Sequence, residues 1–419
     1  MTGRPASFFA PLPYLVAFVA TPLAILAGKL LDKDALFYRY GPHGFAPWLA
    51  LAGLALLASL WASGAARTRI KRPLWPVFAT ALGLSLLAWG LSRVLLLALP
   101  QAESYAPLLD ELRLPALIGF AVLWSGSFGA PGRESLARAG AVLGALMVLD
   151  FLLTAILARG LVPGGGYFFG GAPGTEDALA FLLCLALCAT VDDAPVPGVP
   201  RLARWLILAG LLVSASRAGL ASGALLCLFF ERGPLRGRLT MALACAVAIW
   251  LSLVLPLQHM ATGEELGLDW YYSATAQAMK QEPRALATGL QLDSPVALAM
   301  PELQGVTWDA DSEGQPVSVY QIPASLLRLF AGWGVGGPLL VLGAALYCAL
   351  RGRRRFGFGL LAVLTLCGAL APVLHIPATA AALALALFSA AQRPQTVADS
   401  GQASPEKDPG QDEPSQAPA

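Results

Sequence analysis

The sequence predicts an all-α, polytopic membrane protein with about twelve transmembrane helices. Hydrophobic residues make up 57% of the 419 residues and charged residues only 13%, proportions that exclude an ordinary soluble domain. Apolar stretches recur along the chain, and basic residues are largely confined to the short segments between them. These observations favour a bundle of membrane-spanning helices joined mostly by short loops.

The apolar stretches define the expected spans, several of which are near the lower limit of about 17 residues for crossing a bilayer. The first stretch is longer than the apolar region of a cleaved signal peptide, roughly 7–15 residues, so we interpret it as a retained span. The expected spans are residues 11–31, 46–64, 75–99, 115–129, 139–158, 177–192, 202–216, 218–230, 239–257, 326–350, 357–373 and 376–391.

The basic residues indicate how the spans are oriented, because Lys and Arg of short loops collect on the cytoplasmic side. With the N-terminus in the cytoplasm, every basic cluster falls on that side, and the C-terminus is cytoplasmic as well. The clusters lie in residues 67–72, 133–138, 201–204, 232–238 and 351–355. The external side receives only scattered basic residues: Lys29, Lys33, Arg39, Arg113, Arg159, Arg217, Lys280, Arg284 and Arg328.

Arg217 interrupts the apolar stretch from Leu206 to Phe230, which basic residues flank on both sides. At about 1.5 Å per residue each arm measures about 20 Å, which is short of the roughly 30 Å hydrocarbon core. Both flanks belong on the cytoplasmic side, so we expect the chain to turn back at Arg217. An unpaired guanidinium below the membrane surface costs roughly 2.5 kcal/mol or more, so Arg217 is expected to bind an anion.

Four regions follow from this assignment. Residues 1–257 hold transmembrane helices 1–9, residues 258–325 form one large external loop, and residues 326–392 hold helices 10–12. Residues 393–419 are rich in Gln, Pro, Ser, Asp and Glu and are expected to form a disordered cytoplasmic tail. A loop as long as 258–325 is usually functional, and we expect helical character over Asp269–Ala287, with the helix ending near Pro283.

Composition also limits the expected ligands. The basic residues mark loops rather than a continuous patch, so nucleic acid is not an expected partner. All six cysteines lie inside apolar stretches, without the spacing of metal ligands or disulfides, and are expected to be small buried side chains. No metal ion or other cofactor is expected.

Three segments of the chain carry a specific resemblance. They are VSASRAGL at Val213–Leu220, GGAPGTEDALA at Gly170–Ala180, and SLLRLFAGWGVGG at Ser325–Gly337. With the spaced alanines of Tyr272–Pro283, they resemble the O-antigen ligase and O-antigen polymerase superfamily of bacterial inner-membrane proteins. The resemblance covers about residues 165–350 and implies metal-independent glycan transfer from an undecaprenyl-diphosphate-linked donor to a glycan, lipid or protein acceptor.

The resemblance implies a role for Arg217 as the catalytic residue, because a guanidinium stabilises the charge that develops on a diphosphate leaving group. The chain departs from the ligase pattern at two positions. Tyr320–Ser325 holds no histidine where the ligases have one, and Leu268–Trp270 holds no arginine where the ligases have one. The histidine motif is therefore degenerate, and function of the polymerase type gains weight.

Further candidate site residues are chosen because they are expected at or near the external face. Candidate substrate-binding residues are Arg328, Arg93, Arg159, Lys280 and Arg284, and candidate bases that could replace the missing histidine are His259 and His375. For Arg93 the alternative is a structural ion pair with Asp150, because isolated charges inside a membrane seek partners. For Arg328 the alternative is a helix-end side chain that reaches to the interface.

Three functions follow as hypotheses. The first is a lipid-linked glycan ligase or polymerase at the periplasmic face of the inner membrane. The second is a non-catalytic relative that binds the glycolipid or supports an export complex. The third is a secondary transporter, for which the expected repeat symmetry and polar midplane helices are not evident. The expected partners are an undecaprenyl-diphosphate-linked glycan, a glycan or lipid acceptor, and membrane lipids.

Overall fold

The structure is a computed structural model that describes residues 8–61, 106–157, 175–191, 201–232, 234–254, 268–290, 319–352 and 354–392. All regular elements within these ranges are helical, which confirms the all-α fold class. The expected span 75–99, the tail from residue 393 and much of the large loop lie outside the described residues.

Helices occupy the described parts of the expected spans, often with other bounds, and further short helices lie between the spans. Their bounds are α2 Leu12–Leu15, η1 Val16–Ala20, α3 Thr21–Leu30, α4 Asp34–Tyr40, α5 Ala46–Trp61, α7 Ala106–Ser127, α8 Arg133–Leu157, α9 Thr175–Thr190, α10 Arg201–Ser214, α11 Arg217–Leu225, η3 Leu226–Phe230, α12 Leu235–Val254, α13 Leu268–Gln281, α14 Ala285–Thr288, η7 Val319–Gln321, α16 Ser325–Trp333, α17 Gly336–Arg351, α18 Arg354–Leu370 and α19 Pro377–Ala391.

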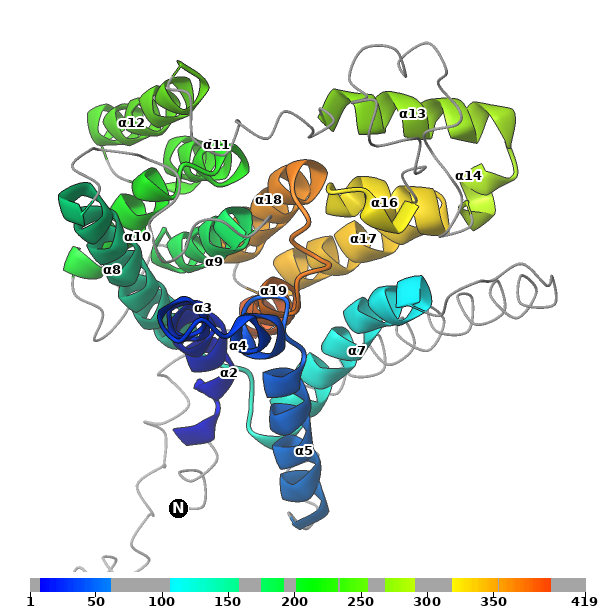
Figure 1. Cartoon of the computed structure of the whole chain (residues 1–419), viewed down its shortest axis with the longest axis horizontal. Coiled ribbons are helices and arrows are strands. Elements are labelled where there is room, and N and C mark those ends of the chain that lie inside the picture. The colour runs from blue at the N-terminus through cyan, green and yellow to red at the C-terminus, as the bar shows by residue number, and fades with distance from the viewer. Residues whose placement is uncertain are drawn as a thin grey trace, which may run out of the picture.

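Two helices, α9 and α19, form the centre of the bundle. Both are apolar on all sides and buried along nearly their whole length, as expected for core helices. Helix α9 packs against α8, α10, α11, α18 and α19. In Figure 1, α8, α10 and α12 lie on one side of this centre, and α16, α17 and α7 lie on the other.

The peripheral helices turn apolar faces outward. Large side chains such as Ile156 of α8 and Leu243 and Trp250 of α12 are exposed, and exposed apolar surfaces of this kind need a cover. Among the described residues, three helices are long and apolar enough to cross a membrane: Leu12–Leu30, Arg133–Ile156 and Leu235–Ser252. These faces indicate association with a membrane, while the count of about twelve spans stays a prediction.

One expected span is wrong as a single element. Residues 326–350 form two helices, because Gly334 adopts a φ of 66° and ends α16, a backbone conformation that glycine adopts without steric cost. A Cβ on Gly337 would lie 2.7 Å from the carbonyl oxygen of Leu329. Eight helical residues span about 12 Å, so the chain folds back here. Arg328 therefore lies on a short helix of its own rather than at the start of a span.

Helix α7 is also longer than the expected span 115–129, because it begins at Ala106 and continues through Pro115. Glu111, in this N-terminal extension, is buried and forms an ion pair with Arg328 of another helix. Helix α13, by contrast, begins at Leu268 and ends at Gln281, close to the helix expected from Asp269.

Candidate functional site

Arg217 lies at a break between two helices. Helix α10 ends at Ser214, Ala215 takes a φ of 53°, and Ser216 is extended with a φ of −65° and a ψ of 116°. The left-handed conformation at Ala215 costs a residue with a Cβ about 1–2 kcal/mol. The Ser216 hydroxyl offsets part of this cost, because it caps α11 by accepting a hydrogen bond from the N–H of Gly219 at 3.1 Å. Arg217 then follows as the first residue of α11.

The two arms of this break run back along each other, as expected. A Cβ on Gly223 would lie 2.4 Å from Cδ2 of Leu211, although twelve residues of continuous helix would separate the two positions by about 18 Å. At the far end of the arms, Arg204 of α10 forms an ion pair with Glu231, which follows η3. The hairpin is therefore confirmed, with Arg217 at its tip.

The Arg217 side chain is exposed and weakly held. Its Nη2 donates to the carbonyl oxygen of Ser252 at 3.4 Å, near the C-terminus of α12, where the helix dipole favours a cation. No carboxylate among the residues that the structure describes forms an ion pair with it. The adjacent Asp177 of α9 accepts a hydrogen bond from the Ser216 hydroxyl instead.

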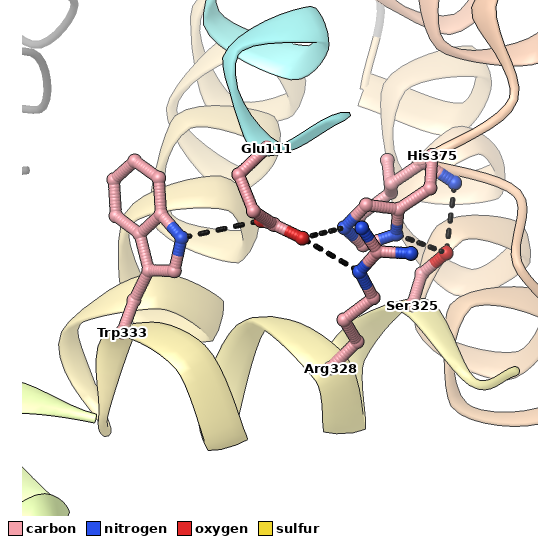
Figure 2. A network of polar contacts seen from close by, with 6 residues as sticks. Glu111, Ser325, Arg328, Trp333 and His375 are labelled. Carbon is pink, nitrogen blue, oxygen red and sulfur yellow. Dashed lines mark hydrogen bonds and ion pairs between the residues drawn. The ribbon is translucent and has the colours of Figure 1, made fainter. Parts of the chain in front are cut away.

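A second polar cluster lies around Glu111, which projects from α7 (Figure 2). Its Oε1 accepts a hydrogen bond from Nε of Arg328 at 2.6 Å and lies 3.6 Å from Nε2 of His375. Its Oε2 accepts a hydrogen bond from the indole N–H of Trp333 at 3.4 Å. We call Glu111, Arg328, His375, Ser325 and Trp333 the Glu111 network.

The other ring nitrogen of His375 is engaged as well. Its Nδ1 lies 3.4 Å from the Ser325 hydroxyl, which also accepts the N–H of Leu374 at 2.9 Å. Ser325 begins α16, and its backbone N–H donates to the carbonyl oxygen of Ala371 at 3.1 Å. His375 is thus held between Ser325 and Glu111, with Nε2 within ion-pair distance of Glu111 but beyond hydrogen-bond distance, and its side chain is 6% exposed.

The ion pair at the centre of the Glu111 network is buried. Glu111 is 1% exposed and Arg328 is 8% exposed, so Arg328 does not reach to the interface as an ordinary helix-end side chain does. Burial raises the pKa of Glu111, but the positive charges and hydrogen bonds of His375 and Arg328 outweigh it and hold the pKa at about 2. The carboxylate is therefore charged at neutral pH and compensates the guanidinium.

Three of the segments that carry the family resemblance meet at one place, the C-terminal end of α18 at residues 367–371. The hairpin contacts it from one side, and α16 and the loop helix α13 contact it from others. These contacts join Cys367 to Ala218 and Ser222, Gly368 to Leu326, Ala369 to Tyr272, and Ala371 to Ser325.

The fourth segment joins the same assembly through the hairpin. Only Thr175–Ala180 of the glycine-rich segment Gly170–Ala180 is described, and it forms the first turns of α9. A Cβ on Gly219 would lie 2.6 Å from the Cβ of Ala180, so these helices are in close contact. Segments that are far apart in the sequence thus surround one helix end.

The remaining candidates are less informative. Lys280 and Arg284 are exposed, at the end of α13 and just before α14, and neither belongs to the Glu111 network. Arg93, Arg159 and His259 lie outside the described residues. The expected pair of Arg93 and Asp150 is therefore untested.

A different cation lies within electrostatic reach of Asp150. Lys29, near the end of α3, interacts with the charges of Asp150 and Glu176. Asp150 thus does not depend on Arg93 alone for a positive neighbour.

Sequence reasoning missed Glu111 because it placed the residue in a loop before the expected span 115–129. If residues 106–114 are assigned to a helix, the sequence does contain a signal that points to Glu111. Glu111, Leu114 and Ile118 recur at spacings of three and four residues, so one face of the helix carries a carboxylate into an apolar stripe. Such a carboxylate requires a cation from another helix.

Comparison with known proteins adds no family assignment. No protein-family model matches this chain, and no curated protein sequence matches it.

Proposed function

We propose that the protein transfers or polymerises lipid-linked oligosaccharide at the periplasmic face of the bacterial inner membrane. Its donor is a glycan on undecaprenyl diphosphate, its acceptor is a glycan or lipid, and Arg217 contacts the diphosphate. The observation that carries the proposal is the exposed Arg217, whose guanidinium has, among the residues that the structure describes, only a long hydrogen bond to a carbonyl oxygen.

The chemistry of glycan transfer suits this guanidinium. The acceptor hydroxyl oxygen attacks the anomeric carbon, the bond to the donor's phosphate oxygen breaks, the diphosphate leaves with the electron pair, and the hydroxyl proton passes to the departing phosphate oxygen or to water. A preorganised guanidinium stabilises that charge, and its planar fork matches phosphate oxygens. The N-terminus of α11 adds the positive end of a helix dipole at the same position.

The convergence of the four family-like segments also supports the proposal. A shared external site requires that these segments lie together, and they surround the end of α18 and the tip of the hairpin. The resemblance that motivated the proposal thus concerns one region of the fold rather than scattered helices.

The proposed topology as a multi-pass inner-membrane protein agrees with the contacts between helix ends. Every pair below joins residues that the distribution of basic residues assigns to the same side of the membrane. The external pairs are Pro42 with Ala378, Glu111 with Arg328, and Asp177 with Ser216, and the cytoplasmic pairs are Arg204 with Glu231 and Gly352 with Ala390.

The proposal is tested in cells that lack the chromosomal gene and carry variants on a plasmid. Arg217→Ala and Arg217→Lys are expected to abolish or shorten the ladder of surface polysaccharide bands on a gel. Arg236→Ala is the matched control, because Arg236 is an exposed arginine at the opposite end of the bundle. Unchanged banding with both Arg217 variants, at equal protein level in the membrane, would overturn the proposal.

One observation favours a second candidate, a non-catalytic protein that binds the same glycolipid. The His375 side chain is only 6% exposed, between Ser325 and Glu111, so it is poorly placed to act as a base on an acceptor hydroxyl. Protein reconstituted in vesicles with a lipid-linked oligosaccharide extract distinguishes the two candidates. Binding without turnover supports the second candidate, and product formation excludes it.

A further inference from the structure

Within α13, all of which the structure describes, Tyr272 is the one large apolar side chain that is exposed. The two aromatic residues before it, Trp270 and Tyr271, pack against the apolar cluster between α13 and α16, and their ring centroids lie 5.1 Å apart. Tyr272 is outside that cluster. Packing of the loop helix onto α16 therefore does not account for this aromatic ring.

The Tyr272 side chain is held at both of its ends. Its hydroxyl donates a hydrogen bond to the carbonyl oxygen of Ala369 at 2.7 Å. Ala369 lies in the last turn of α18, where helix carbonyls have no partner within the helix, so this bond caps α18. A ring that is already held loses little conformational freedom when a ligand binds to it.

The surface around Tyr272 is polar. Helices α8 and α12 turn Leu, Val, Ile or Trp side chains outward, whereas Asp269 and Lys280 are exposed on α13. Exposed tyrosines also act as anchors at the membrane interface, where they adjoin apolar spans, but the outward face of α13 is of the kind that contacts water. Ala276, one turn after Tyr272, is exposed and too small to cover the ring.

Tyr272 and the Arg217 hairpin flank the same end of α18, which lies between α11 and α13 in Figure 1. On the hairpin side, the Cys367 thiol donates to the carbonyl oxygen of Ala218 at 3.6 Å. Two residues of a helix project to nearly opposite sides, so Cys367 and Ala369 are separated by about the width of one helix, roughly 10–12 Å. An oligosaccharide whose diphosphate lies at Arg217 can span that distance.

We propose that Tyr272 binds saccharide, with its ring stacked on the apolar face of a pyranose from the donor or acceptor glycan. That face of a sugar presents C–H groups with partial positive charge, and the face of an aromatic ring is negative. Asp269, on the same side of α13 as Tyr272, supplies an acceptor for sugar hydroxyls. This inference rests on the proposed function and adds a sugar subsite to the diphosphate contact of Arg217.

Three variants separate the ring from the cap. Tyr272→Phe keeps the ring and loses the hydroxyl, whereas Tyr272→Leu and Tyr272→Met lose both. The bond to Ala369 is absent in all three, so any difference from Tyr272→Phe measures the ring alone. The control is Tyr38→Leu, which removes an exposed tyrosine from α4. Each protein is purified and reconstituted in vesicles with lipid-linked oligosaccharide and acceptor extracted from the producing cells.

Tyr272→Leu is expected to raise KM about 3–10-fold relative to Tyr272→Phe, because an aromatic contact is lost, while kcat changes little. A rise in KM for the lipid-linked donor assigns the sugar to the donor, and a rise in KM for the acceptor assigns it to the acceptor. Equal values of both constants in the Leu and Phe variants overturn the inference, as does an equal rise in Tyr38→Leu. If Tyr272→Leu does not fold, the same comparison is made with Tyr272→Met.

A binding measurement keeps this inference separate from the proposed function. Oligosaccharide released from its lipid by mild acid, and freed of phosphate, is titrated into each protein and followed by calorimetry. Tyr272→Phe is expected to bind it several-fold more tightly than Tyr272→Leu, and equal binding overturns the inference whatever the turnover. Full activity of Arg217→Ala defeats the proposed function, whereas equal Leu and Phe variants beside an inactive Arg217→Ala defeat only the sugar subsite.

Discussion

Arg217 and Arg328 occupy similar positions within their helices, but their environments in the fold differ. Each lies in the first turn of a short helix that follows a few non-helical residues. Arg217 is exposed and, within the described part of the chain, reaches only a carbonyl oxygen, whereas Arg328 is buried and paired with Glu111. A carboxylate from another helix therefore makes the difference between an arginine that faces solvent, as Arg217 does, and one that is held inside the fold, as Arg328 is.

The comparison predicts its largest effect at Glu111. Glu111→Ala leaves the buried guanidinium of Arg328 without a counter-charge and is expected to cost about 3–5 kcal/mol of stability. Arg217→Ala removes an exposed side chain and is expected to change stability by no more than about 0.5 kcal/mol. Thermal unfolding of the two variants in detergent measures both values. Equal losses for the two variants would remove the contrast between the two arginines.

Acid pH is expected to weaken the same ion pair. Glu111 precedes the apolar part of α7, and its pKa is about 2, compared with an ordinary value of 4.5. Because the folded-state pKa is depressed, its contribution to stability is fully present above pH 4.5 and is lost as the pH falls toward 2. Thermal midpoints between pH 6 and 3 should therefore fall more steeply for wild type than for Glu111→Gln. Parallel curves would show that Glu111 is not the titrating group.

A smaller effect is expected where the hairpin meets α9. A Cβ on Gly219 would lie 2.6 Å from the Cβ of Ala180, which cannot rotate away, so Gly219→Ala should cost about 1–3 kcal/mol through overpacking. Gly343→Ala is the matched control, since a Cβ there meets nothing within 4 Å. That variant should be neutral or stabilising by up to about 1 kcal/mol, because alanine favours a helix. Unfolding in detergent compares the two, and no loss for Gly219→Ala would contradict the close packing.

The smallest effect is expected at the cap of α11. Ser216→Ala removes the acceptor for the N–H of Gly219 and the donor to Asp177, and should cost about 1 kcal/mol. Ser273→Ala, at an exposed position of α13, is the control. If Ser216 also orients Arg217, the variant shifts polysaccharide banding in the same direction as Arg217→Ala but less strongly. Banding that changes without any loss of stability would assign Ser216 to the site rather than to the cap.

The hairpin could be predicted because its cause is local in the sequence. Two short apolar arms with basic flanks can satisfy the positive-inside rule only by turning back. The Glu111 network could not be predicted in this way. Glu111, Arg328 and His375 are separated by more than forty residues at each step, and no periodicity connects them. The fold of residues 326–350 was missed for a different reason, because apolar composition continues through Gly334 although the backbone does not.

The sequence by itself determined the helical, membrane-associated character of this protein and the return of the chain at Arg217. Both depend on the cost of placing backbone polar groups and charges in an apolar environment, which composition and spacing reveal. Which charges become partners depends on how the helices pack. An ion pair is a contact between side chains a few ångströms apart, and helix packing brings Glu111 of α7 to Arg328 of α16 from distant parts of the chain. The same packing keeps described carboxylates out of ion-pair distance of Arg217, and this contrast makes the proposed site testable.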